Sequence, residues 1–291
     1  MEEIEKYSAK WFLSLYLMTG SVEEVFRSYP DTIPISPANY HRLVKRYGLV
    51  KSAGRHVSLP ETLHFFKLKA MKPGMPLEVL YKSMPRSFQT SLSTLHRIYH
   101  FMERRIVRRK AAALLLIKDN NKKEVLVGNE VFENLRYGKK TNDTSIPMGF
   151  SKKDEPNCDS ILRVLQQEVY TQLAMSAKLG KNTNLVKTII PKKIEPIFYF
   201  DIVDVRVSVF LVSIPPNLVE FSSYKLVNHR FQSLGDIING ENIRTGVEEI
   251  VKIYEDYLSR QYTVNFPVQH LSFLNSIVAA PNPKLALRYL K

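Results

Sequence analysis

Residues 144–171, TSIPMGFSKKDEPNCDSILRVLQQEVYT, form the passage that decides the fold. The pattern predicts a short strand over Thr144 to Phe150, a polar loop, and then a helix from about Cys158 to Ala174. Residues three and four apart are neighbours on a helix, so positions 164, 167, 168 and 171 would share one face. That face would carry Val164, Gln167, Glu168 and Thr171.

Further predicted elements surround this passage on both sides. Apolar runs predict strands at Ala111 to Lys118, Glu124 to Gly128, Ile194 to Val203 and Arg206 to Ile214, and an amphipathic helix is predicted at Gly246 to Leu258. This mixture of strands and helices predicts an α+β domain over residues 109–260. The C-terminal extension, residues 261–291, has no predicted role.

Upstream of that domain the chain contains an internal repeat. Five matched residues recur with a constant offset of 55: Ser28, Pro30, Ser36, His41 and Arg42 in the first copy, and Ser83, Pro85, Ser91, His96 and Arg97 in the second. A repeat at a fixed offset indicates that one structural unit occurs twice.

Each copy has the pattern of two short helices separated by a turn. Ser36 and Ser91 are the predicted N-caps of the later helix in each copy, and apolar residues follow at helical spacing. After the first copy, the segments 49–51 and 56–58 predict a small hairpin, or wing. The second copy ends in the basic, strand-like segment 104–110.

These features resemble tandem winged helix-turn-helix units, over residues 1–60 and 61–108. The resemblance implies that double-stranded DNA is the partner and that the later helix of each unit enters a major groove. The implied DNA-binding residues are Ser36, Asn39, His41, Arg42, Lys45, Arg46, Ser91, Thr94, His96, Arg97, Arg104 and Arg105. Two alternatives remain open: such units also make protein–protein contacts, and a repeated His-Arg pair can serve packing or capping.

The charge is concentrated in the repeat. The whole chain has a formal net charge of +14, and residues 1–110 hold 19 Lys and Arg against 9 Asp and Glu, a net +10. Such an excess favours a polyanionic partner, because neutralised phosphates release counterions, although a solvated basic surface gives the same composition. The single cysteine, Cys158, excludes an internal disulfide framework. With no apolar run of about 20 residues and an acidic N-terminus, we expect a cytoplasmic protein without a membrane span.

The passage quoted first resembles the Nudix hydrolase signature, which runs Gly, five residues, Glu, seven residues, Arg-Glu-aliphatic-x-Glu-Glu-x-Gly. Gly149, Glu155, Arg163, Leu165 and Glu168 stand at matching positions, and Phe231 to Ile238 resembles the family's late loop. The resemblance implies an α/β/α sandwich that binds a nucleotide-type small molecule. By the resemblance, Gly149 and Glu155 contact that ligand, Arg163 and Glu168 serve catalysis, and Glu168 holds Mg²⁺.

Several family positions are changed in this chain. Val164 and Gln167 replace two of the signature's Glu residues, and Tyr170 replaces its Gly. One carboxylate is a weak Mg²⁺ site, so we expect impaired catalysis unless another acid completes it. The candidates for that acid are Asp154, Asp159, Asp201, Asp204 and Glu241. Alternatively, Arg163 and Glu168 only brace the helix, and Glu155 only stabilises its start.

Three functions are therefore open. The first is a DNA-binding regulator, of the transcriptional kind, whose Nudix-like domain binds a nucleotide-type ligand or mediates assembly. The second is a Mg²⁺-dependent hydrolase of a nucleoside diphosphate derivative, with the N-terminal units as a targeting module. The third is an interaction protein that neither binds DNA nor hydrolyses a nucleotide.

Overall fold

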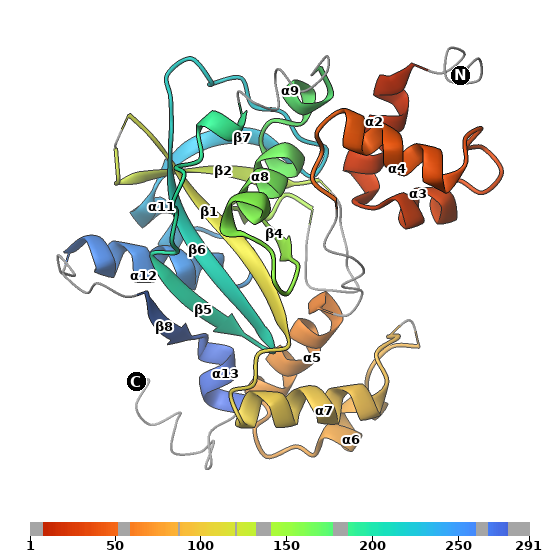
Figure 1. The fold of residues 1–291 in the computed structure, drawn as a ribbon. Helices are drawn as coiled ribbons and strands as arrows, with labels where there is room; N and C mark the ends of the chain where they lie inside the picture. Colours follow the sequence, from red (N-terminus) through yellow and green to blue (C-terminus); the bar gives the residue numbers. More distant parts are fainter. Residues whose placement is uncertain are drawn as a thin grey trace.

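A set of N-terminal helices leads into an α+β part built around a mixed sheet (Figure 1). The computed structural model describes residues 8–51, 59–86, 88–119, 121–131, 141–176, 186–259 and 267–278. No helix within these ranges is both long enough and apolar enough to cross a membrane.

The described helices that precede the sheet fall into two groups of three. Unit 1 consists of α2 (Ala9–Thr19), α3 (Val22–Ser28) and α4 (Pro37–Arg46), and unit 2 consists of α5 (Leu59–Met71), α6 (Leu77–Lys82) and α7 (Leu92–Glu103). The Ser36 hydroxyl accepts a hydrogen bond from the Asn39 backbone N–H, and the Ser91 hydroxyl accepts one from that of Thr94. Both predicted N-caps are therefore confirmed, and α3–α4 and α6–α7 are the helix pairs that the repeat predicts.

The two units bury their apolar residues differently. Unit 1 has its own core, in which Phe12 and Tyr40 are fully buried. Among the described residues, Ala174, Met175 and the partly buried Tyr224 join it from the rest of the chain. Unit 2 shares one continuous core with the sheet, because Phe66 and Ile98 belong to the same cluster as strand residues such as Val207. Unit 2 is thus integrated with the α+β part, whereas unit 1 is attached to it.

The strands form two sheets. The larger has the order β4-β1-β6-β5-β8, and the smaller has the order β3-β2-β7. Their bounds are β1 (Arg109–Lys118), β2 (Glu124–Glu130), β3 (Thr144–Ser145), β4 (Met148–Ser151), β5 (Phe198–Ile202), β6 (Val205–Ile214), β7 (Leu226–Ser233) and β8 (Val268–Leu271). Strands β1 and β6 are parallel over their whole length, and β4 is antiparallel to β1.

Helices cover both faces of the larger sheet. Successive side chains of β1 point to opposite faces, so this strand contributes to an apolar core on each side. Ala113, Leu115 and Ile117 belong to the core that contains α12 (Val247–Ser259) and unit 2. The alternate residues, such as Leu114, belong to the core that contains α8 (Asn157–Glu168). The predicted α+β domain is confirmed at this level, and its apolar first strand is the central element between the two cores.

The predicted wing after the first copy and the strand-like segment 104–110 after the second both differ from expectation. Leu49 to Lys51 form no strand, and the other half of that predicted hairpin, residues 56–58, lies outside the described residues. In the second copy, Arg109 and Lys110 begin β1, while Arg104 and Arg105 lie in the turn after α7. The predicted strand-like character of 104–110 is therefore confirmed only at Arg109 and Lys110, which the long apolar run after them draws into the large sheet.

Part of the C-terminal extension completes the fold. Strand β8 pairs in parallel with β5 at the sheet edge, and α13 (Phe273–Val278) contacts α5 and α7. Figure 1 shows α13 beside unit 2, below the start of β1. The Asn275 side chain of α13 also binds the turn between β5 and β6, where its amide donates to the Val203 carbonyl at 2.9 Å.

The same turn fixes the segment that joins unit 2 to the sheet. The Asp204 carboxylate is fully buried and accepts hydrogen bonds from Arg108 Nε at 2.6 Å and Arg109 Nη2 at 2.5 Å. The Asp204 carbonyl also accepts from the backbone N–H groups of both arginines. Asp204 therefore sets the point at which the chain enters β1.

We predict that Asp204→Asn lowers the free energy of unfolding by about 3 kcal/mol, because it leaves the Arg109 guanidinium buried without a counter-charge. Arg108 is partly exposed, so water can solvate its guanidinium in the variant. The expected loss of unfolding free energy is therefore near the lower end of the range for breaking a buried ion pair. Urea unfolding measures the change. Asp154→Asn, at an exposed position, is the matched control and should change stability by less than about 0.5 kcal/mol. A loss below about 1 kcal/mol for Asp204→Asn would contradict this role.

Candidate functional site

The Nudix-like passage forms a strand, a loop and a helix, β4, residues 152–156 and α8. A Cβ added at Gly149 would lie 3.3 Å from Val164 Cγ2, so glycine there lets α8 pack closely on β4. The predicted helix over 158–174 is two helices, because α8 ends at Glu168 and α9 (Thr171–Ser176) begins after a break. Tyr170, in that break, forms a bridge with Ser222.

Arg163 and Glu155 form a buried ion pair inside this passage. Arg163 also donates to the Phe150 carbonyl at 2.8 Å, and the Glu155 carboxylate accepts from the Lys152 N–H and the Ser160 hydroxyl. Burial lowers the pKa of the Arg163 guanidinium from its ordinary value, yet arginine remains charged in proteins. Both side chains thus hold the loop against the helix, and the predicted partner of Arg163, Glu168, is not the one it contacts.

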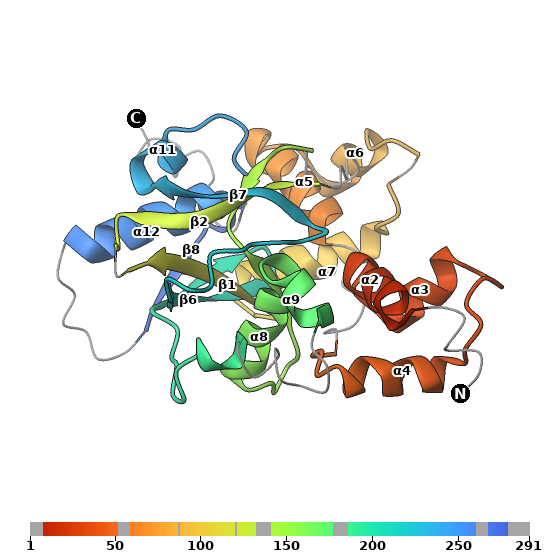
Figure 2. The ribbon, with the colours of Figure 1, turned by 90° about the horizontal axis from the view of Figure 1, so that it is seen from above.

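Helix α8 also contacts unit 1. The Gln166 amide donates to the Gly48 carbonyl at 3.0 Å and accepts from the Val50 N–H at 3.0 Å. Arg163 Nε donates to the Lys51 carbonyl at 2.9 Å. Figure 2 shows unit 1 beside α8 and α9. The segment after α4 is therefore attached to the Nudix-like helix by three hydrogen bonds, which no local sequence pattern predicts.

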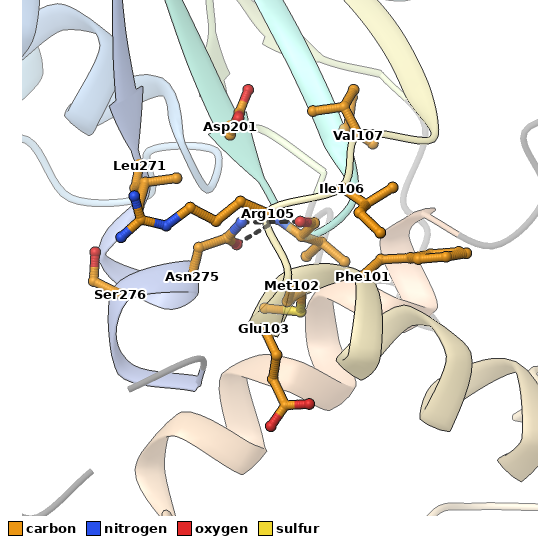
Figure 3. Close-up of a pocket in the computed structure, with 12 residues that line it drawn as sticks. Phe101, Met102, Glu103, Arg105, Ile106, Val107, Asp201, Leu271, Asn275 and Ser276 are labelled. Carbon is orange, nitrogen blue, oxygen red and sulfur yellow. Dashed lines mark hydrogen bonds between the residues drawn. The ribbon is translucent and has the colours of Figure 1, made fainter. Parts of the chain in front are cut away.

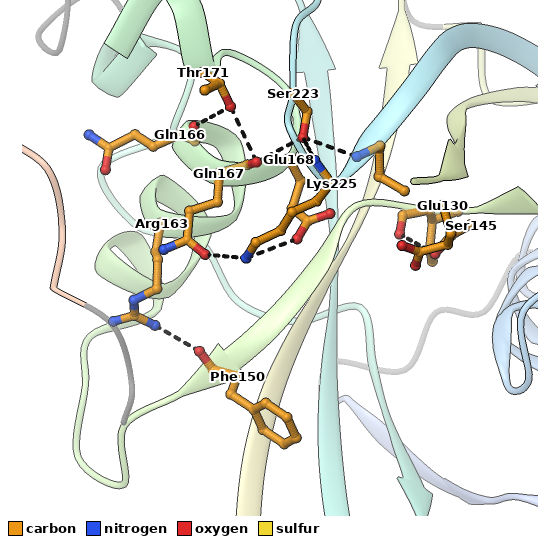
Figure 4. Close-up of polar contacts among 12 residues, drawn as sticks. Glu130, Ser145, Phe150, Arg163, Gln166, Gln167, Glu168, Thr171, Ser223 and Lys225 are labelled. Carbon is orange, nitrogen blue, oxygen red and sulfur yellow. Dashed lines mark hydrogen bonds and ion pairs between the residues drawn. The ribbon is translucent and has the colours of Figure 1, made fainter. Parts of the chain in front are cut away.

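The other predicted face of α8 meets a lysine. Lys225 Nζ lies 2.9 Å from Gln167 Oε1 and 3.6 Å from Glu168 Oε1. Figure 4 shows the lysine side chain between these two groups. The Ser223 hydroxyl donates to the Gln167 carbonyl and accepts from the Lys225 N–H, which positions the lysine. An ammonium group thus lies where the family resemblance places a metal ion beside Glu168.

The residues present do not fit a Mg²⁺ centre. Mg²⁺ needs several oxygen ligands in near-octahedral geometry, and no group of three acidic, histidine or cysteine side chains that could hold a metal occurs among the described residues. Two of the acids that might have completed the site are used elsewhere: Asp201 binds Arg206, and Asp204 binds the segment before β1. The Glu168 carboxylate lies 3.6 Å from the Lys225 ammonium group, which competes with a cation for it.

His229 contacts the same end of α8. Its Nε2 lies 2.8 Å from the Glu168 carbonyl oxygen, and its ring is 5.8 Å from that of Phe221. Burial lowers the pKa of His229 from 6.5, and the hydrogen bond to Glu168 partly opposes that shift. Neither His229 nor Lys225 stands in a recognisable motif, so the sequence predicts neither contact. His229 lies on β7 and Lys225 directly precedes it. The pairing of β7 with β2 brings both residues to α8.

The residues predicted to bind DNA lie mainly on the outer faces of α4 and α7. Asn39, Arg42, Lys45 and Arg46 are exposed on α4, and His96 and Arg97 are exposed on α7, where Thr94 is half-buried; Arg104 and Arg105 are exposed just after it. Ser36 and Ser91 cap these helices as described, and Asn39 accepts a hydrogen bond from Arg42.

The repeated histidines form a matching contact in both units. His41 lies 3.7 Å from Glu23, and His96 lies 2.8 Å from Glu78. The two glutamates are also 55 residues apart, so the pair belongs to the repeat. Each pair joins the second helix of its unit to the third, which agrees with the alternative that the repeated histidine serves packing.

Comparisons with known proteins find similarity only at the level of structure. No family model matches the chain, and no curated protein matches it in sequence. A NUDIX hydrolase from Nitrosomonas europaea has a TM-score of 0.40 at 9% identity, covering 57% of this chain and 80% of its own. An Ap4A hydrolase from C. elegans has a TM-score of 0.35 at 15% identity, covering 53% and 99%. An ADP-ribose pyrophosphatase from Streptococcus suis has a TM-score of 0.34 at 10% identity, covering 56% and 98%.

We predict that His229 makes stability depend on pH. The unfolded chain takes up a proton on this residue near pH 6.5, while burial resists protonation in the folded protein. Its contribution is therefore constant above about pH 6.5, and stability falls as the pH drops below that value. His229→Gln should reduce the loss of unfolding free energy between about pH 7.5 and pH 5.5, as urea unfolding at each pH would measure. An unchanged loss in the variant would count against a buried, neutral His229.

Proposed function

We propose that this protein is a DNA-binding regulator whose Nudix-like domain does not hydrolyse nucleotides efficiently and instead binds a nucleotide-type ligand or mediates assembly. The DNA-binding part of this proposal rests on a feature that occurs in both helical units. Each unit has an arginine at the same exposed position on its third helix, Arg42 on α4 and Arg97 on α7. Further cations surround these arginines, including Lys45 and Arg46 on α4 and Arg104 after α7.

The chemistry of these helices suits a DNA duplex. The major groove accepts a helix, and an arginine there can donate two hydrogen bonds to guanine. The remaining lysines and arginines would contact phosphates and fix the position of the protein on the duplex. The helices that would enter the groove are α4 and α7. Ser36 and Ser91 satisfy backbone N–H groups at their N-terminal ends, which supports this arrangement.

The Nudix-like part sets how the two helices are presented. Unit 2 shares its core with the sheet, while unit 1 is attached through Gln166 and Arg163 to α8. A ligand that changed the attachment of unit 1 would therefore change the relation of α4 to α7. DNA and that ligand would then affect each other's affinity by the same factor.

The proposal of impaired catalysis is supported by the contacts of Glu168. Its carboxylate pairs with Lys225, Gln167 accepts from the same lysine, and Val164 packs beside Gly149. A single carboxylate neutralised by an ammonium group offers no strong metal cage and no activated water.

We predict that the intact protein binds mixed-sequence duplex DNA and that affinity falls as salt rises, with a slope in log–log form of about −0.9 for each phosphate bound. Replacing Lys45 and Arg46 with alanine should reduce that slope by about 1 for each phosphate that the variant no longer binds, and should weaken binding to all sequences alike. Fluorescence anisotropy at several salt concentrations measures both quantities.

The matched control is Lys122→Ala with Lys123→Ala, which removes two exposed cations from the turn before β2 and should leave binding unchanged. If the intact protein fails to bind duplex DNA even at low salt, the DNA-binding proposal is wrong. Equal losses of affinity in the two double variants would mean that only net charge matters.

We also predict no efficient Mg²⁺-dependent turnover of ADP-ribose or Ap4A. These compounds are the ones after which two of the structurally similar hydrolases are named. Product release followed by chromatography measures this in the presence of Mg²⁺ or EDTA. Turnover that requires Mg²⁺ and disappears in Glu168→Gln would instead identify a hydrolase, because the same carboxylate would then be needed for the metal.

A further inference from the structure

A cavity of about 540 Å³ lies away from α8, where unit 2 joins the sheet. Its wall is formed by the end of α7, the segment leading to β1, the turn between β5 and β6, and α13. Apolar side chains of Met102, Ile106, Val205 and Leu271 contribute much of the lining. A cavity of this size can hold a small organic molecule.

Arg105 extends across this cavity. Figure 3 shows its side chain running from the end of α7 toward Leu271 and Ser276. The guanidinium makes no hydrogen bond or ion pair with any residue that the structure describes, although arginine carries five donors. A cation with open donors therefore lies in a cavity whose wall is about equally apolar and polar.

The neighbouring polar groups are already occupied. The Asp201 carboxylate accepts from Arg206 and from Gln269. The Asn275 amide is bound on both sides to the Val203 backbone, and the Ser276 hydroxyl donates to the Ser272 carbonyl. Among the residues that line the cavity, Arg105 is the one cation, and its donors are open.

The backbone of Arg105 is unusual for its residue type. Arg105 has a φ of 55°, in the left-handed region. Its N–H donates to the Met102 carbonyl and the next N–H, of Ile106, donates to the Phe101 carbonyl. This pair of bonds is the Schellman motif that ends many helices, and the left-handed position in it is usually glycine.

The first copy of the repeat shows the usual solution. Helix α4 ends with the same pair of bonds, from Gly48 to Lys45 and from Leu49 to Val44, and its left-handed residue is Gly48 with a φ of 66°. A side chain at this position is unfavourable because Cβ approaches the backbone. Arg105 therefore accepts a strained conformation that glycine would avoid, and such strain is commonly kept where the side chain has a function.

We propose that this cavity binds a small organic carboxylate, with Arg105 holding the carboxylate and the apolar part of the wall, such as Ile106 and Leu271, holding the body of the molecule. The planar guanidinium matches a carboxylate through two parallel hydrogen bonds. One open cation balances a single negative charge, and Glu103 at the rim disfavours a dianion such as a phosphate monoester. This site is separate from the α8 region and does not depend on the proposed function.

The test uses the full chain and three related probes: 2-naphthoate, the uncharged 2-naphthamide, and 2-naphthyl phosphate. Isothermal titration calorimetry should show that 2-naphthoate binds about tenfold or more tightly than 2-naphthamide, because the amide lacks the charge that Arg105 pairs with. Arg105→Gly should weaken 2-naphthoate binding to the level of the amide. Arg104→Ala, at the exposed neighbour that does not line the cavity, is the control and should bind 2-naphthoate as the parent protein does.

The glycine variant also keeps the experiment interpretable. Glycine suits the left-handed position, so Arg105→Gly should unfold at the same temperature as the parent protein or higher. Unchanged 2-naphthoate binding in this variant would overturn the proposal. Stronger, Arg105-dependent binding of 2-naphthyl phosphate would overturn the carboxylate assignment. If Arg105→Gly lost DNA binding but kept 2-naphthoate binding, Arg105 would contact DNA and the proposal would be wrong.

Discussion

The buried carboxylate of Asp204 is the contact on which the arrangement of this protein depends. It holds Arg108 and Arg109 at the start of β1, while Asn275 holds the backbone of the adjacent Val203. One tight turn therefore joins three distant parts of the chain: the end of unit 2, the hairpin β5–β6 and the C-terminal helix α13. A buried charge without its partners is costly, so the turn, the linker and the parallel pairing of β1 with β6 are stable only together.

The two helical units show how one repeated sequence can be attached in two ways. Unit 2 merges its apolar face with the sheet, and unit 1 keeps a core of its own and makes polar contacts through Gln166 and Arg163. A few hydrogen bonds and a small apolar contact with Ala174 and Met175 make a weaker attachment than a shared apolar core. Movement within the molecule is therefore expected at unit 1, next to the α8 end where Glu168 meets Lys225.

Local features were predictable from the sequence, and contacts between distant segments were not. Ser36 and Ser91 cap their helices because capping depends only on residues within one turn. The basic segment 104–110 enters a strand only at Arg109, where Arg108 and Arg109 bind the distant Asp204, and no local pattern reveals that contact. Lys225 likewise reaches Glu168 through strand pairing. The strand β8 was missed because it is short and lies at an edge, where it shows little apolar alternation.

The packing of α13 against α5 and α7 has a consequence for how the chain is made. Unit 2 is synthesised early, yet part of the surface it packs against comes from residues near 275, which the ribosome adds much later. Unit 1 has a nearly self-contained core and can fold as soon as it leaves the ribosome. The apolar surface of unit 2 must wait for the sheet and for α13, so during synthesis the first unit is complete while the second is still exposed. Chaperone binding during translation would therefore be concentrated on the second copy of the repeat.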